Sequence, residues 1–218
     1  MILEPPQLVK SSVKNSIKIL FIISLSLFFL IFLILNSYLQ CPVSHQYEWL
    51  KFLNLVENNY FVLNQKKWDI ENGGQLSIRK NNTYAKNFKL SQGLQELIVN
   101  SGNNNNSLQI GIKNVILGDL TKVFFSYPNL EGLTNGTVLL NDIYENFQLS
   151  SQLNIDQFSF NNDLIGLVKT NIGYTQKTGI VPFELNAPNI GYNLMAKGSY
   201  NIKDSLNPLD ATLFLKHS

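Results

Sequence analysis

The feature that most constrains this chain is an uncharged, mostly apolar run from Ile19 to Leu39. As a helix that rises about 1.5 Å per residue, this run is long enough to cross the hydrocarbon core of a bilayer. A secretory signal peptide has a shorter apolar region and a small-residue cleavage site, and the run fits neither. The sequence therefore predicts one uncleaved transmembrane helix close to the N-terminus.

The charges that flank this run predict its orientation. Lys10, Lys14 and Lys18 precede it, whereas only His45 and Glu48 follow it closely. Because basic residues are retained on the cytoplasmic side, we expect a cytoplasmic N-terminus and an exported C-terminal domain, which in a bacterium places a single-pass protein in the inner membrane and its domain in the periplasm. The expected divisions are a tail at 1–18, the transmembrane helix at 19–39, a juxtamembrane linker at 40–57 and a β-rich domain at 58–218.

Charge and composition exclude several classes of function. The chain has 17 basic and 15 acidic residues, and Arg79 is its only arginine, so it lacks the basic cluster of a nucleic-acid-binding protein. Cys41 is the only cysteine, and the two histidines are His45 and His217. Neither a zinc site nor a serine or cysteine triad therefore has its usual parts. We expect no enzyme, no catalytic residue, no metal site and no cofactor.

Beyond residue 58 the dominant pattern is an alternation of apolar and polar residues, which is typical of strands with one buried face. Four stretches carry it, with these apolar positions: Leu108, Ile110 and Ile112; Phe147, Leu149, Leu153 and Ile155; Leu164, Val168 and Ile172; Ile190, Tyr192, Leu194 and Ala196. Each stretch predicts a strand with an apolar side and a polar side.

Turn signals separate these stretches and predict hairpins in sequential order. They lie at Asn72-Gly73-Gly74, Asn81-Asn82, Ser101 to Asn106, Asn135-Gly136, Asn161-Asn162-Asp163, Lys177-Thr178-Gly179 and Pro188-Asn189. The one predicted helical segment runs from Leu117 to Tyr127. The fold class is therefore mainly β: a transmembrane helix followed by an antiparallel meander of about ten to twelve strands. With few helices to cover it, the apolar side forms either an open groove or the core of a sandwich or jelly roll.

Several short motifs resemble the translocation and assembly module protein family, TamB, in the asparagine-rich form of Bacteroidota. They span about residues 57–218 and comprise Asn59-Tyr60-Phe61-Val62-Leu63-Asn64 with Lys67-Trp68-Asp69-Ile70, then Leu130 to Leu140, Leu153 to Phe160, Lys197-Gly198-Ser199-Tyr200 and Pro208-Leu209-Asp210. Within these motifs we expect Phe61 and Trp68 to be structural residues that pack at the first hairpins.

The resemblance implies an AsmA-like β-groove that is anchored in the inner membrane and carries phospholipid towards the outer membrane. It also implies a partner of the BamA-like, TamA type in the outer membrane. The chain is shorter than members of that family, and residues 208–218 resemble the start of a unit at Ser107 to Leu117. We therefore expect a short or split member, for which a downstream fragment of the same system is a second candidate partner.

If the groove carries lipid, one continuous apolar face holds the acyl chains. The alternation predicts that this lipid-binding face contains Leu149, Leu153, Ile155, Leu164, Val168, Ile172, Leu194 and Ala196. Two other functions remain open from the sequence. One is a bitopic subunit of lipopolysaccharide transport that resembles LptC, and the other is an envelope scaffold with a closed, dry core.

Overall fold

The computed structural model of the chain describes residues 60–79, 82–102, 106–122, 129–189 and 191–217. The predicted tail, transmembrane helix and linker at 1–57 lie outside these residues. In the described ranges, no helix combines the length and the apolar character needed to cross a membrane.

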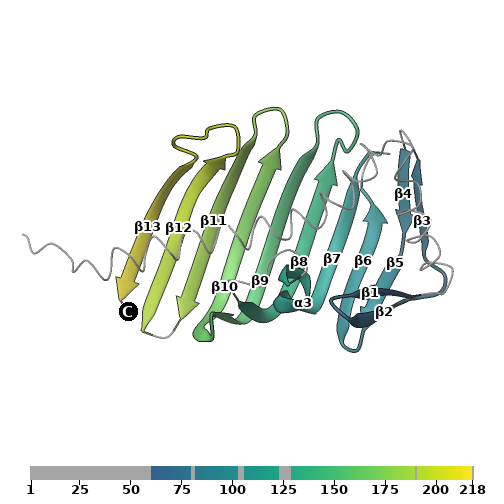
Figure 1. The fold of residues 1–218 in the computed structure, drawn as a ribbon, viewed down its shortest axis with the longest axis horizontal. Coiled ribbons are helices and arrows are strands. Elements are labelled where there is room, and N and C mark those ends of the chain that lie inside the picture. Colours follow the sequence, from purple (N-terminus) through teal and green to yellow (C-terminus); the bar gives the residue numbers. More distant parts are fainter. Residues whose placement is uncertain (1–59, 80–81, 103–105, 123–128, 190, 218) are drawn as a thin grey trace, which may run out of the picture.

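Thirteen strands and one short helix make up the described part of the chain (Figure 1). The strands are β1 (Tyr60–Leu63), β2 (Lys66–Ile70), β3 (Gln75–Arg79), β4 (Asn82–Lys86), β5 (Phe88–Gln92), β6 (Gln95–Ser101), β7 (Leu108–Ile116), β8 (Leu130–Asn141), β9 (Gln148–Phe160), β10 (Asp163–Thr175), β11 (Ile180–Asn189), β12 (Tyr192–Asn201) and β13 (Leu209–His217). The helix α3 (Leu117–Thr121) connects β7 to β8.

Eleven of these strands form one sheet in the order β1-β2-β5-β6-β7-β8-β9-β10-β11-β12-β13, and β3 pairs with β4 in a separate two-stranded sheet. Every pairing is antiparallel, and β1 and β13 are the two edges of the large sheet. Figure 1 shows the strands in nearly sequential order across the molecule. The predicted mainly β, antiparallel meander is confirmed, and the sheet does not close on itself.

The sheet has one buried face, as the alternation predicts. In β9, Leu149, Ser151, Leu153 and Ile155 are buried, and the residues between them are exposed. The buried apolar residues form two clusters. One extends from Trp68 to Phe183 and the other from Leu117 to Ala196.

β-Bulges interrupt the alternation in neighbouring strands. Register shifts occur in the β7–β8, β8–β9 and β9–β10 pairings. Residues with positive φ lie at or beside them: Asn114, Gly132, Gln157 and Gly166. A bulge adds one residue to a strand, so the side chains beyond it point to opposite faces from those that strict alternation predicts.

The prediction of a turn at Asn135-Gly136 is wrong, because both residues lie inside β8. Gly136 has a φ of +150°, and a Cβ atom there would lie 2.1 Å from the carbonyl oxygen of Gln152 on the neighbouring strand. Glycine is therefore required by the close approach of two backbones rather than by a hairpin. Asn135 accepts a 2.9 Å hydrogen bond from the backbone N–H of Asn114, at the β7 bulge.

Three of the other six turn predictions are confirmed. Turns follow β2 at Asn72–Gly73, β9 at Asn161–Asn162 and β10 at Gln176–Gly179. Pro188 and Asn189 are instead the last residues of β11, and Gly191, the next described residue, lies in a turn. The predicted helix at 117–127 is confirmed for Leu117–Thr121, and residues 123–128 lie outside the described ranges, as do Asn81 and residues 103–105 of the two remaining turns.

Candidate functional site: an apolar face that crosses the sheet

The strand registers align apolar residues into rows that run across the sheet, perpendicular to the strands. The longest row extends from β2 to β13, and each residue pairs with the next across a strand boundary: Ile70, Leu90, Leu97, Ile112, Gly136, Leu153, Thr170, Leu185, Ala196 and Leu213. A second row runs beside it through Phe88, Val99, Ile110, Val138, Ser151, Ile172, Phe183, Gly198 and Ala211. We call the side of the sheet that carries these rows the apolar face.

Seven of the eight predicted lipid-binding residues lie on the apolar face. Six of them are buried, with exposed fractions of 7% or less: Leu149, Leu153, Ile155, Val168, Ile172 and Ala196. Leu194 is half-buried and packs against the second cluster. The structure therefore brings together residues from β9, β10 and β12 on one side of the sheet, as strand alternation requires.

Leu164 is the exception, and its assignment to the apolar face is wrong. Its side chain is 72% exposed. The register between β9 and β10 shifts on both sides of Gly166, which has a φ of +102°. This bulge reverses the alternation, so that Ile165 rather than Leu164 packs against the second cluster.

Sequence reasoning missed the contribution of β11 to the apolar face. Val181, Phe183, Leu185 and Ala187 are all buried, and they alternate with more exposed residues. The signal was present as an apolar residue at every second position. The two prolines of this segment obscured it, because proline argues against a central strand. Both Pro182 and Pro188 are exposed.

Three hydroxyl side chains interrupt the apolar face. Thr134, Ser151 and Thr170 are buried to exposed fractions of 6% or less. The Ser151 Oγ donates to the Ile172 carbonyl over 3.4 Å, whereas the Oγ1 atoms of Thr134 and Thr170 have no hydrogen-bond partner among the residues that the structure describes. A hydroxyl without a partner in an apolar setting is unfavourable, and both of these atoms are buried.

Elements outside the large sheet pack mainly on the β6–β8 region. The helix α3 contacts β7 and β8, and β4 contacts β6 and β7. Leu120 belongs to the first cluster and Leu117 to the second, so α3 packs where the two clusters meet. From β4, Thr83 and Ala85 are buried, and the Thr83 hydroxyl is hydrogen-bonded to that of Tyr144.

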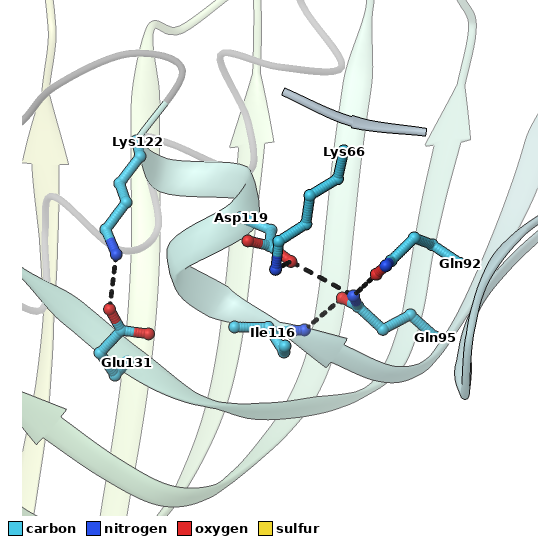
Figure 2. Close-up of polar contacts among 7 residues, drawn as sticks. All are labelled: Lys66, Gln92, Gln95, Ile116, Asp119, Lys122 and Glu131. Atoms are coloured by element: carbon cyan, nitrogen blue, oxygen red, sulfur yellow. Dashed lines mark hydrogen bonds and ion pairs between the residues drawn. The ribbon is translucent and has the colours of Figure 1, made fainter. Parts of the chain in front are cut away.

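A buried polar network fixes α3 in place (Figure 2). Asp119 is 5% exposed, and its Oδ2 atom lies 2.7 Å from Lys66 Nζ and 3.2 Å from Gln95 Nε2. Gln95 also accepts a 2.7 Å bond from the backbone N–H of Ile116 and donates to Gln92. Because these partners come from β2, β5, β6 and β7, the network ties four strands to the helix.

The opposite side of the sheet is polar and holds a shallow cavity of about 420 Å³. Glu184 and Lys197 are the charged side chains that line it, and they pair across β11 and β12. Its other lining residues include Thr137, Leu139, Ser150, Gln152, Asn171, Gly173 and Pro182. In the described ranges, no group of three or more histidine, cysteine, aspartate or glutamate residues is placed to hold a metal ion.

The electrostatics differ between the two sides. On the polar side, hydrogen bonding to Glu71 raises the pKa of Lys89, and hydrogen bonding to Lys89 lowers the pKa of Glu96. The Lys89 Nζ atom lies 3.0 Å from Glu71 and 3.3 Å from Glu96, and Lys113 lies 3.4 Å from Glu96. On the apolar face, burial raises the pKa of the Tyr174 phenol. This face thus favours neutral groups.

The longest continuous feature of this arrangement is the row of apolar side chains from Ile70 to Leu213. In comparisons with known proteins, no family model, no curated protein and no solved structure matches the chain.

Proposed function

We propose that the chain is an inner-membrane-anchored protein of the cell envelope, and that the apolar face of its periplasmic sheet binds the acyl chains of phospholipids during lipid transport or outer-membrane assembly. The observation that carries this proposal is the row from Ile70 to Leu213, which crosses ten strands with two interruptions, at Gly136 and Thr170.

The dimensions of the row suit an extended apolar ligand. Neighbouring strands are about 4.8 Å apart, so ten strands give a track of roughly 45 Å. A globular ligand needs an enclosed pocket, whereas a linear acyl chain can follow such a track along its length. Transfer of the acyl chain's own apolar surface from water to such a track is favourable by about 25 cal/mol for each Å² that is buried.

Two features of the sequence support the location and the partners. The run Ile19–Leu39, preceded by three lysines, supports an inner-membrane anchor with the sheet in the periplasm. The resemblance to the TamB family supports a partner of the BamA-like, TamA type in the outer membrane, or a downstream fragment of the same system.

An envelope scaffold is the second candidate, and the burial of the face supports it. Ile155 and Val168 are at most 1% exposed. Side chains buried to this extent are typical of a dry, packed core. The scaffold and the lipid carrier therefore differ in what lies against this face in the membrane-bound protein.

The test introduces one aspartate on each side of the same strands. Leu153→Asp and Val168→Asp place a charge on the apolar face, and the matched controls Gln152→Asp and Lys169→Asp place it at neighbouring exposed positions of β9 and β10. A photoreactive amino acid at Leu194, on the same face, reports contact with phospholipid in membranes that contain the full chain. Resistance to limited proteolysis reports folding.

For a lipid carrier, the two apolar-face variants stay folded but lose most of the phospholipid adduct, because an unpaired charge is strongly disfavoured in an apolar track. The two controls keep the adduct. Folded apolar-face variants that form as much phospholipid adduct as the wild type would contradict the lipid proposal. If these variants unfold and the wild type forms no phospholipid adduct, the scaffold is the correct account.

A further inference from the structure

The two edges of the large sheet are built differently. β1 has four residues and pairs with β2, which continues to β5 through only two residue pairs. β13 has nine residues, all of which pair with β12 without a register shift. No strand in the described ranges pairs with the outer side of β13. A short edge strand offers few unpaired backbone groups to another chain, whereas a long, regular edge strand is a template for another strand.

Apolar side chains become more exposed as the rows reach β13. In the row that pairs Ala187 with Leu194 and Leu194 with Leu215, burial falls from complete at Ala187 to half at Leu194, and Leu215 is 57% exposed. On the polar side of the same strand, Phe214 is 60% exposed. In Figure 1, β13 forms the left-hand edge of the sheet. β13 therefore offers exposed apolar side chains on both of its sides, next to its unpaired backbone.

The sequence of β13 is complementary to itself. If two copies of the strand pair antiparallel about Leu213, all nine residues find a partner and Asp210 faces Lys216 of the second copy, twice over. In the same register Ala211 faces Leu215, and Thr212 faces Phe214. The two Phe214 rings are then diagonal neighbours at about 7 Å, which is within the reach of aromatic side chains.

This register also joins equivalent faces. Residues on the same side of a strand differ by an even number, and pairing about Leu213 matches odd with odd and even with even. The apolar face of one copy thus continues into the apolar face of the other. Moving the centre to Thr212 or Phe214 would separate Asp210 from Lys216 and leave end residues of the strand unpaired.

We propose that β13 is a dimerisation strand, which pairs antiparallel with β13 of a second copy about Leu213 and joins the two sheets into one. The interface is isologous, as in most homodimers, because the same strand contributes from both copies. The proposal rests on the edge geometry and charge pattern of β13, and it does not depend on whether the apolar face binds lipid.

Disulfide cross-linking of the full chain in detergent tests the register. The only native cysteine is removed as Cys41→Ser, and single cysteines are introduced. Leu213→Cys sits opposite itself at a separation compatible with a disulfide, so it forms covalent dimers on mild oxidation. Ala211→Cys faces residue 215 of the other copy, so two cysteines at 211 are offset by four residues, or about 13 Å, and remain monomeric.

Charge reversal tests the same interface without cysteine chemistry. Asp210→Lys or Lys216→Asp places like charges opposite each other twice, and either change should weaken dimerisation about tenfold in sedimentation equilibrium. The double variant restores opposite charges and should return the dimer to near wild-type affinity. Lys169→Asp reverses an exposed charge on β10, away from the edge, and should leave the dimer unchanged.

Three results would overturn the proposal. The first is a wild-type chain that stays monomeric at every concentration tested. The second is a dimer that cross-links through residue 211 as well as through residue 213. The third is a dimer that each charge reversal leaves intact, which would place the contact elsewhere. Circular dichroism of each variant shows that the strand content is kept.

Discussion

The two halves of the large sheet are stabilised in different ways. In the N-terminal half, β1, β2 and β5–β8 are mostly short, and α3 and β4 pack against β6–β8. In the C-terminal half, β9–β13 have nine to thirteen residues each and contact mainly their neighbours in the sheet. We call the N-terminal half the packed end, because α3 and β4 pack against its strands. The C-terminal half is a regular sheet in which the rows of side chains continue from strand to strand.

This difference predicts two classes of substitution. Substitutions under α3 and β2 should lower stability whether or not lipid is present, because protein groups fill that space. Substitutions on the apolar face of β9–β12 should also lower stability where the side chain is buried, and they should in addition alter what this face binds. The polar network around Asp119 belongs to the first class, since its partners come from strands of the packed end (Figure 2).

The largest expected effect is at Trp68, which is fully buried in the first cluster. Trp68→Ala should lower the free energy of unfolding by about 3–5 kcal/mol, because it removes a large apolar side chain and leaves a cavity. Urea unfolding of the full chain in detergent measures this loss. Tyr84→Ala, at a 43% exposed position of β4, is the control and should cost much less. A loss of under 1 kcal/mol for Trp68→Ala would show that the N-terminal half is not a packed end.

A pair of substitutions in β10 tests the bulge at Gly166. Val168→Ala should cost about 2 kcal/mol, because this side chain is 1% exposed. Leu164→Ala should change the free energy of unfolding by no more than about 0.5 kcal/mol, because its side chain is 72% exposed. Equal losses from the two changes would mean that β10 keeps strict alternation and that Leu164 does reach the apolar face.

The network around α3 should give a smaller effect. Asp119→Ala removes the partner of Lys66 and Gln95, and it should cost about 1–3 kcal/mol because a polar group of Gln95 loses its buried partner. Glu131→Ala breaks the ion pair of Lys122 with Glu131, whose side chain is 35% exposed, and should cost less than about 1 kcal/mol. Thermal unfolding of both variants decides the comparison. A larger loss of stability for Glu131→Ala than for Asp119→Ala would show that the network does not hold α3 in place.

The smallest expected effect is a pH dependence on the polar side of the N-terminal half. Hydrogen bonding to Lys89 lowers the pKa of Glu96 below its ordinary value of 4.5. A carboxyl group with a lowered folded-state pKa stabilises the fold above its unfolded pKa, and this contribution is lost as the pH falls through the folded pKa. Glu96→Gln should therefore flatten the loss of stability below pH 4.5. An unchanged acid slope in urea titrations would show that the ion pairs with Lys89 and Lys113 do not persist in solution.

Alternation in the sequence predicted which residues of β9 and β12 share a face, because the period of a strand is two and one face is buried. It failed where bulges add a residue, and so it misplaced Leu164. Asn135-Gly136 was misread for a related reason: the same dipeptide that suits a hairpin also suits a strand in which two backbones approach closely. Neither bulges nor close approaches follow from local sequence, because both depend on the neighbouring strand.

The continuous rows also could not be predicted from the sequence. Each strand predicts only its own two faces, whereas a row requires the register of every pairing in turn. Gly136, Leu153 and Thr170 are neighbours only because β8, β9 and β10 pair in one particular register. The position of α3 against the clusters likewise depends on Asp119 and its partners from distant strands.

The most direct test of the central claim is a scan of β9 with a photoreactive amino acid, one residue at a time from Leu149 to Ile155, in membranes that contain the full chain. The account predicts a period of two: phospholipid adducts at residues 149, 151, 153 and 155, on the apolar face, and none at 150, 152 and 154, which are exposed on the polar side. Folded variants with no adducts at the four apolar-face positions, or with equal adducts at all seven, would contradict the claim that this face binds lipid.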